Sequence, residues 1–157
     1  MRTGQTQRLF SLLSGLWVGS FITIGFLVVP VLFSSLGDRQ IAGMVAAKLF
    51  ELTAYSGVVM SVILMVMANY LVRENLNSYR ITRWILLGML ICAIGAAFVI
   101  IPWMNSLRDQ ALYLGLSVRE STNATLFSRL HSASSSLFMI QAILGLFLVW
   151  RATKNAD

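Results

Sequence analysis

The residues best suited to chemistry in this sequence are an arginine and a histidine at the start of an apolar stretch. Arg129 and His131 precede the uncharged segment 132–150, and His131 is the only histidine among 157 residues. An imidazole changes its charge near neutral pH. Ionisable side chains at the mouth of a membrane helix cost free energy, so they usually have a partner or a function. These two residues are therefore candidates for handling a proton or a ligand.

A second polar group lies earlier in the chain. Lys48, Glu51 and Tyr55 are spaced three and four residues apart, so they share one face of a helix. If this helix and the one carrying His131 begin at the same membrane surface, Glu51 can pair with Lys48, Arg129 or a protonated His131. We expect these five side chains to lie at one depth of the membrane.

Polar residues continue along the same helix as His131. Ser135 and Gln141, with Ser134 between them and the histidine, predict a polar seam that points into a helix bundle. Three interpretations stay open: contacts that hold helix ends together, a site that handles a proton or a substrate, and a metal site. One histidine and one cysteine, Cys92, at another depth can hardly complete a metal shell, and two histidines for a haem are lacking. We expect no metal and no cofactor.

The composition places these residues in a membrane protein. Hydrophobic residues make up 57% of the chain and charged residues 11%, whereas soluble domains have about 25% charged residues. The net charge of +6 comes from basic residues in short segments between apolar stretches. Membrane topology and contact with anionic lipid headgroups explain this pattern better than nucleic-acid binding does. A single cysteine excludes an internal disulfide.

Four apolar stretches predict four membrane-spanning helices, at about 9–33, 48–72, 84–104 and 131–150. Each provides the roughly 20 apolar residues that span a bilayer. The first has 25 residues without a charge, more than the about 7–15 of a signal peptide, so we expect an uncleaved span. The predicted fold is all-α: an integral membrane four-helix bundle with up-down topology, in a single domain that covers residues 1–157.

The connecting segments predict the helix ends and the orientation. The second helix is expected to begin near Ile41, and the fourth near Ser117, which has the capping-box spacing with Glu120. Seven basic residues, from Arg2 to Lys154, fall on the side of the termini and five on the other side. Because basic residues favour the cytoplasm, we expect both termini there, with the site at the outer face. A multi-pass protein of the bacterial inner (plasma) membrane fits this pattern.

Small residues and prolines predict how the helices pack. Gly15 and Gly19 belong to one stripe with a spacing of four residues, and Gly88 belongs to another. Such stripes let a second helix approach closely. Pro30 and Pro102 mark the ends of the first and third spans.

Three segments resemble a known family: 19–33 with its proline, 42–50 with Lys-Leu-Phe, and 126–135, whose Phe-x-Arg-Leu-His-x-x-Ser core is the most specific. The segment 101–104 with Arg108 also fits. These segments are similar to small bacterial membrane proteins of a domain-of-unknown-function family related to eukaryotic transmembrane protein 205. Where that family usually has glycine after the histidine, this chain has Ser132. The resemblance implies a four-helix integral membrane protein without an established biochemical activity.

Three functional hypotheses follow. The first is a non-enzymatic protein whose polar His/Arg/Glu/Lys cluster shapes a cavity that binds or passes a small solute, a cation or a proton. The second is a structural or accessory subunit of a larger membrane complex. The third is a haem- or quinone-linked redox protein. The sequence has no catalytic triad and no phosphate-binding loop, so we expect no enzyme of those classes. Expected partners are the lipid bilayer and either a second copy or a larger membrane complex, but no nucleic acid.

Overall fold

The computed structural model describes residues 3–154, and these form four long helices and no strand. The first and third helices each contain a π-helical turn and are divided at that point. The elements are α1 (Thr3–Thr23), η1 (Ile24–Val28), α2 (Val29–Ser35), α3 (Arg39–Arg73), α4 (Tyr79–Ile94), η2 (Gly95–Ile100), α5 (Ile101–Tyr113) and α6 (Ala124–Lys154).

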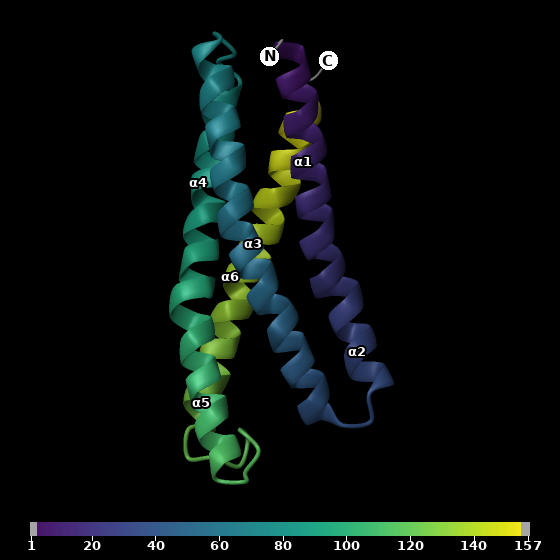
Figure 1. Ribbon diagram of the computed structural model, residues 1–157, viewed down its shortest axis with the longest axis vertical. Helices are drawn as coiled ribbons and strands as arrows, with labels where there is room; N and C mark the ends of the chain where they lie inside the picture. The colour runs from purple at the N-terminus through teal and green to yellow at the C-terminus, as the bar shows by residue number, and fades with distance from the viewer. Residues whose placement is uncertain (1–2, 155–157) are drawn as a thin grey trace.

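All four helices are long and apolar enough to cross a membrane. The continuous helical segments have 33, 35, 35 and 31 residues, and at 1.5 Å per residue each exceeds the roughly 30 Å hydrocarbon core. The start of α1 and the end of α6 lie at the same end of the molecule (Figure 1). We call this the proximal end, and the end with the α2–α3 and α5–α6 connections the distal end. The predicted all-α, up-down membrane bundle is confirmed. Arg2 lies outside the described residues.

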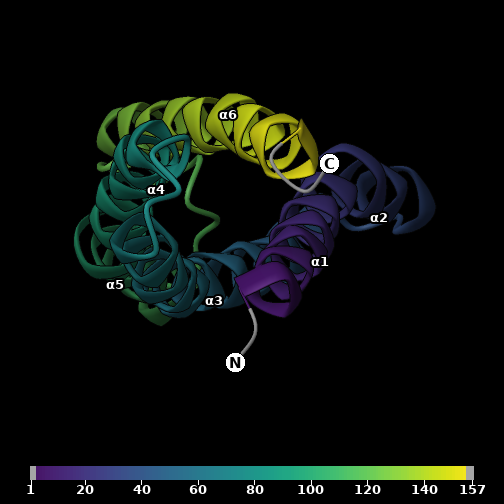
Figure 2. The same cartoon turned by 90° about the horizontal axis from the view of Figure 1, so that it is seen from above.

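The helices form a ring in which each contacts two neighbours. Helix α1 contacts α3 and α6, and α4 contacts the same two helices from the other side. Figure 2 shows this ring from above, in the order α1, α3, α4, α6. The arrangement brings the first and last helices together, and Ser11 Oγ donates a hydrogen bond to the carbonyl oxygen of Ala152 at 3.1 Å.

The tightly packed core lies in the proximal half. Its centre includes Phe10 and Tyr79, whose rings meet edge to face at 5.4 Å between centroids. In the distal half, η1, α2 and the part of α6 before Gln141 contain no buried residue. The bundle is therefore looser at the distal end, where side chains leave space between the helices.

Each π-helical turn ends two residues before a proline, Pro30 or Pro102. The N–H of Val29 bonds to the carbonyl of Ile24 and the N–H of Ile101 to that of Ala96, both five residues back. Proline lacks an N–H and its ring crowds the carbonyl four residues before it, and the wider turn makes room for this. As a result, Pro102 does not end the third helix, which continues to Tyr113. The predicted end near 104 was wrong.

The distal loop starts with a left-handed residue and contains a short turn. Gly115 has φ +69°, and the N–H of Leu116 bonds to the carbonyl of Ala111, as in a Schellman cap. The capping-box pair forms, since both the Ser117 N–H and Oγ donate to Glu120 Oε2, at 3.1 and 2.7 Å. However, the pair closes an isolated turn and α6 begins only at Ala124. The predicted start near Ser117 was wrong, because the hydroxyl donates to the carboxylate and caps no backbone N–H there.

The other connections follow the predicted pattern more closely. Asp38 accepts hydrogen bonds from the N–H groups of Gln40 and Ile41, at 2.7 and 3.3 Å. This N-cap starts α3 at Arg39, close to the predicted Ile41. Asn75 has φ 66° and ends α3 with the same type of cap as Gly115.

The glycines that allow close packing are mostly not the predicted ones. A Cβ at Gly15 or Gly19 would meet nothing within 4 Å, so no other helix of the described chain makes the close approach that this stripe allows. A Cβ at Gly88 would lie 3.2 Å from Leu144 Cδ1. At Gly145 it would lie 3.0 Å from the ring of Phe21. Helix α1 thus meets α6 through the glycine of α6, whereas Gly15 and Gly19 of α1 take no part in this contact.

Candidate functional site

A cavity of about 680 Å³ lies between the helices at the distal end. It is bounded by η1, α2, the first turns of α3, α5, the distal loop and the first half of α6. Most of its wall is apolar, with aromatic rings from η1, α2, α3 and α6. Four cationic or imidazole side chains also line it: Arg39, Arg108, Arg119 and His131.

Phe138 forms the floor of this cavity. Its ring meets Phe50 and Phe21 edge to face, at 5.3 and 5.9 Å between centroids, and Phe26 at 6.1 Å. The edge of the ring lies against Gly25 in η1, where an added Cβ would collide with the ring. Glycine at position 25 is therefore required for this placement of the ring.

A second, smaller cavity of about 30 Å³ lies beside the floor. Three polar side chains line it, those of Thr53, Ser134 and Gln141, together with apolar neighbours that include Phe138. This volume and these polar groups suit one water molecule. Ser134 lines both cavities, so it connects the large cavity with a polar pocket deeper in the bundle.

Arg108 is the most enclosed of the arginines of the large cavity. It is half-buried, and its Nη1 donates a hydrogen bond to Asn105 Oδ1 at 2.9 Å. Its guanidinium carbon lies 5.8 Å from the centroid of the Phe127 ring, within the range of a cation–π contact. The negative charges of Asp109 and Glu51 interact favourably with it. Within residues 3–154, however, the one ion pair closer than 4 Å joins Lys48 and Glu51.

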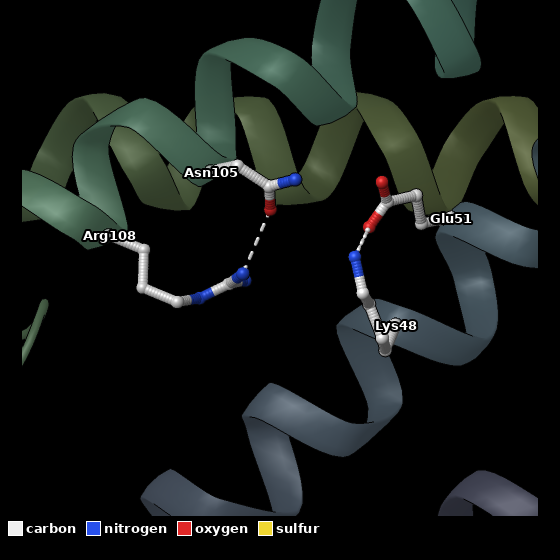
Figure 3. A network of polar contacts seen from close by, with 4 residues as sticks. All are labelled: Lys48, Glu51, Asn105 and Arg108. Atoms are coloured by element: carbon white, nitrogen blue, oxygen red, sulfur yellow. Dashed lines mark hydrogen bonds and ion pairs between the residues drawn. The ribbon is translucent and has the colours of Figure 1, made fainter.

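The predicted site residues of α3, Lys48, Glu51 and Tyr55, lie on the side of α5 and η2 and outside the cavity wall. Lys48 Nζ donates to Glu51 Oε2 at 2.9 Å, and Figure 3 shows this pair opposite Asn105 and Arg108. Farther along this face, Tyr55 meets Phe98 edge to face at 5.7 Å. The structure therefore does not bring Glu51 and His131 into one cavity. The partner of Glu51 is Lys48, one of the three predicted.

The helical period explains which predicted residues reach the cavity. On α6, His131 and Ser135 line the large cavity and Gln141 lines the small one. Arg129 is exposed and does not line either cavity, because two residues rotate the side chain by about 200° around the helix. On α3, Phe50 lines the cavity and Glu51, one residue later, does not.

Sequence reasoning missed the three arginines of the cavity wall as a group. Met104, Arg108 and Leu112 all line the cavity with a spacing of four residues, which is the signature of one helix face. That signal was present in the sequence, but it depends on α5 continuing beyond Pro102. Arg119 lies in the distal loop, where no periodic pattern points to it.

A family model described as a domain of unknown function, DUF4149, matches residues 12–112. The chain belongs to this family. The DUF4149 region includes Arg39, Arg108 and Gly25, and it ends before the segment 126–135, which carried the most specific part of the resemblance. The first three helices thus carry the family pattern, and α6 completes the cavity. Comparisons with curated proteins and with solved structures find no match.

Proposed function

We propose that the protein is a non-enzymatic membrane protein that binds a small amphipathic molecule in the distal cavity. The observation that carries this proposal is the cavity itself, because apolar and cationic side chains line the same space. Its volume of about 680 Å³ falls within the roughly 300–1,000 Å³ of typical small-molecule sites. The apolar wall favours a molecule that is already dissolved in the membrane.

The charges of the wall make this proposal more specific than the hypothesis of a solute or cation site. Each arginine of the wall keeps its charge at physiological pH, so the cavity repels metal cations and favours neutral or anionic molecules. The two carboxylates whose charges act on Arg108, those of Asp109 and Glu51, are not part of the wall. We therefore prefer binding of an amphiphile over passage of a cation.

The orientation and the membrane belong to this proposal as well. The excess of basic residues at the proximal end favours cytoplasmic termini in a bacterial inner membrane, which would make the cavity periplasmic. The relation to eukaryotic transmembrane protein 205 stays a prediction from the resemblance.

Photo-crosslinking tests the proposal in the membrane. A long-chain alcohol with a diazirine on its chain would be added to the full-length protein in phosphatidylcholine nanodiscs, and labelled peptides would be mapped after illumination. We expect labels on the apolar wall, around Phe50, Phe127 and Phe138. Ala47→Trp should remove them by filling the cavity, because Ala47 lines it.

The matched control is Val45→Trp, on the same helix but exposed and outside the wall. Labels spread evenly over lipid-facing residues, and insensitive to Ala47→Trp, would contradict the proposal.

An accessory role in a larger assembly is the second candidate function. It is favoured by the small-residue stripe of α1, where a Cβ at Gly15 or Gly19 would have no other helix of the described residues within 4 Å. Small residues of this kind allow a helix of another molecule to approach closely. Disulfide crosslinking of Gly15→Cys in native membranes would test it, and a chain that stays monomeric and unlinked to other proteins would exclude it.

A further inference from the structure

We propose that the ligand of the distal cavity is a single-chain amphiphile with an anionic headgroup, a carboxylate or a phosphate monoester, bound by Arg108, Arg39 and Arg119. This inference rests on the proposed function and specifies the chemical class of the ligand. It places the headgroup at the distal opening and the hydrocarbon chain against the floor at Phe138.

All formal charges on the cavity wall are positive. Each of the three arginines has an acidic neighbour in the sequence: Asp38, Asp109 and Glu120. None of these acids lines the cavity. For Arg108 and Asp109, which both belong to α5, the reason is that consecutive residues of a helix point in directions about 100° apart. The arginines thus line the cavity and their acidic neighbours do not.

Two of the three acids are also occupied elsewhere. The carboxylate of Asp38 accepts the N–H groups of Gln40 and Ile41 as the cap of α3. The carboxylate of Glu120 accepts both donors of Ser117. Neither carboxylate forms an ion pair closer than 4 Å with an arginine of the wall, since the one such pair within residues 3–154 joins Lys48 and Glu51. The cavity therefore keeps a positive potential that a bound anion would neutralise.

Arg108 is best placed to bind the headgroup. Its contacts with Asn105 and Phe127 hold the guanidinium in place with a neutral amide and a ring. A guanidinium has five N–H donors in a planar fork, which fits a carboxylate or a phosphate in a bidentate manner. A half-buried charge next to an apolar wall is stabilised when a charged partner joins it, and the ligand would provide this partner.

The volume favours one chain over two. At roughly 30 Å³ per non-hydrogen atom, about the share of one water in the liquid, the 680 Å³ of the cavity holds on the order of 20 such atoms. A fatty acid or an alkyl phosphate of medium length fits this space, and a two-chain phospholipid exceeds it. The aromatic floor formed by Phe138, Phe50 and Phe21 closes the space at the chain end.

The test is competition against a labelled fatty acid. Palmitate with a diazirine on its chain would be crosslinked to the full-length protein in phosphatidylcholine nanodiscs, with dodecanoate, dodecyl phosphate, dodecanol or the two-chain lipid phosphatidylglycerol as competitors. We expect the two anions to displace the label at concentrations at least tenfold below that of dodecanol. Arg108→Gln should weaken displacement by dodecanoate about tenfold, which corresponds to about 1.4 kcal/mol. Arg108→Lys should recover only part of it, because lysine keeps the charge and lacks the fork.

Arg129→Gln is the matched control, because it removes an exposed arginine at the same end of the bundle but outside the cavity, and it should change nothing. If Arg108→Gln lowers the melting temperature of the protein, Arg39→Gln and Arg119→Gln repeat the test at exposed positions.

Each outcome decides a different claim. Equal displacement by dodecanol and dodecanoate, unchanged in Arg108→Gln, would overturn the anionic headgroup and leave the proposed function standing. Displacement by phosphatidylglycerol alone would assign the cavity to a two-chain bilayer lipid and overturn the single-chain ligand. A label that no competitor displaces, and that Ala47→Trp does not reduce, would overturn both this inference and the proposed function.

Discussion

The contact between Gly25 and Phe138 gives a prediction whose magnitude can be worked out from the structure. Gly25→Ala adds a methyl group where the Phe138 ring lies, and such overpacking costs about 1–3 kcal/mol. Replacing glycine by alanine within a helix stabilises it by roughly 0.5–1 kcal/mol. The net destabilisation should therefore be about 0–2.5 kcal/mol, and at the lower limit a single measurement would not reveal the steric cost.

Gly19→Ala removes this ambiguity, since it has the same gain in helix propensity and meets no atom within 4 Å. The difference between the two variants isolates the steric cost, and we expect Gly25→Ala to be less stable than Gly19→Ala by about 1–3 kcal/mol. The free energy of unfolding would be measured by steric trapping or by titration with a denaturing detergent. Each variant would be compared with the wild type in the same bicelles.

Phe138→Ala provides the second arm of the experiment. If the ring is the obstacle, Gly25→Ala should carry no steric cost when Phe138 is already replaced by alanine. The effects of the two substitutions are then not additive, and the double-mutant cycle gives a coupling energy equal to the steric cost. Equal stabilities of the Gly25→Ala and Gly19→Ala variants, or additive effects in the cycle, would refute the contact and with it the position of the cavity floor.

Three further predictions concern the residues around the cavity. The Ser117 hydroxyl and, to a smaller extent, the Ser117 backbone N–H donate hydrogen bonds to the Glu120 carboxylate, and these bonds hold the pKa of Glu120 below its usual range. The bonds should therefore stabilise the turn fully above the pKa that Glu120 has in the unfolded chain. This stabilisation should be lost as the pH falls through the lower pKa of the folded state. Ser117→Ala should raise the midpoint of the Glu120 carboxyl titration measured by NMR, and an unchanged midpoint would contradict the hydrogen bond. Glu51→Gln should lower the free energy of unfolding by no more than about 0.5 kcal/mol, because the Lys48 side chain in the ion pair is 74% exposed. The same substitution should leave labelling by the fatty acid intact. A loss of labelling would show that Glu51 belongs to the site. Pro102→Ala should allow regular α-helical hydrogen bonds through η2 and thereby rotate α5 about its axis. A cysteine introduced in place of Arg108 should then react faster with a water-soluble thiol reagent in the Pro102→Ala background than in the background with Pro102. Unchanged protection would show that the π-helical turn does not depend on the proline.

The sequence predicted the four helices and their up-down order, because long apolar stretches can satisfy their backbone hydrogen bonds in lipid only as helices. It also placed the start of α3 within two residues, since Asp38 is a strong N-cap residue. These features depend on local composition, which a single chain displays directly.

The composition of the site could be predicted only in part. His131 was found because it is the only histidine, and it does line the cavity. Glu51 was assigned to the same site because it has a similar depth, but the rotation of α3 turns Phe50 to the cavity and Glu51 to α5. Depth along a helix follows from the sequence, whereas the direction of a side chain depends on packing against neighbours.

The third helix shows why the arginines were missed. Pro102 is a reasonable place to end a helix, and ending it there puts Arg108 in a loop without a defined direction. The π-helical turn at Gly95–Ile100 accommodates the proline, so α5 carries Arg108 to the cavity. The contact of Gly25 with Phe138 joins residues that are far apart in the sequence, so no local sequence pattern predicts it.

The central claim is that the distal cavity binds an anionic single-chain amphiphile. The most direct test is a crystal structure of the full chain with 12-bromododecanoate, in which anomalous scattering locates the bromine and the electron density locates the carboxylate. We predict bromine close to the rings of Phe50 and Phe138, with the carboxylate within hydrogen-bond distance of Arg108. Bromine found only on the lipid-facing surface of the helices, with the cavity filled by side chains or water, would contradict the claim.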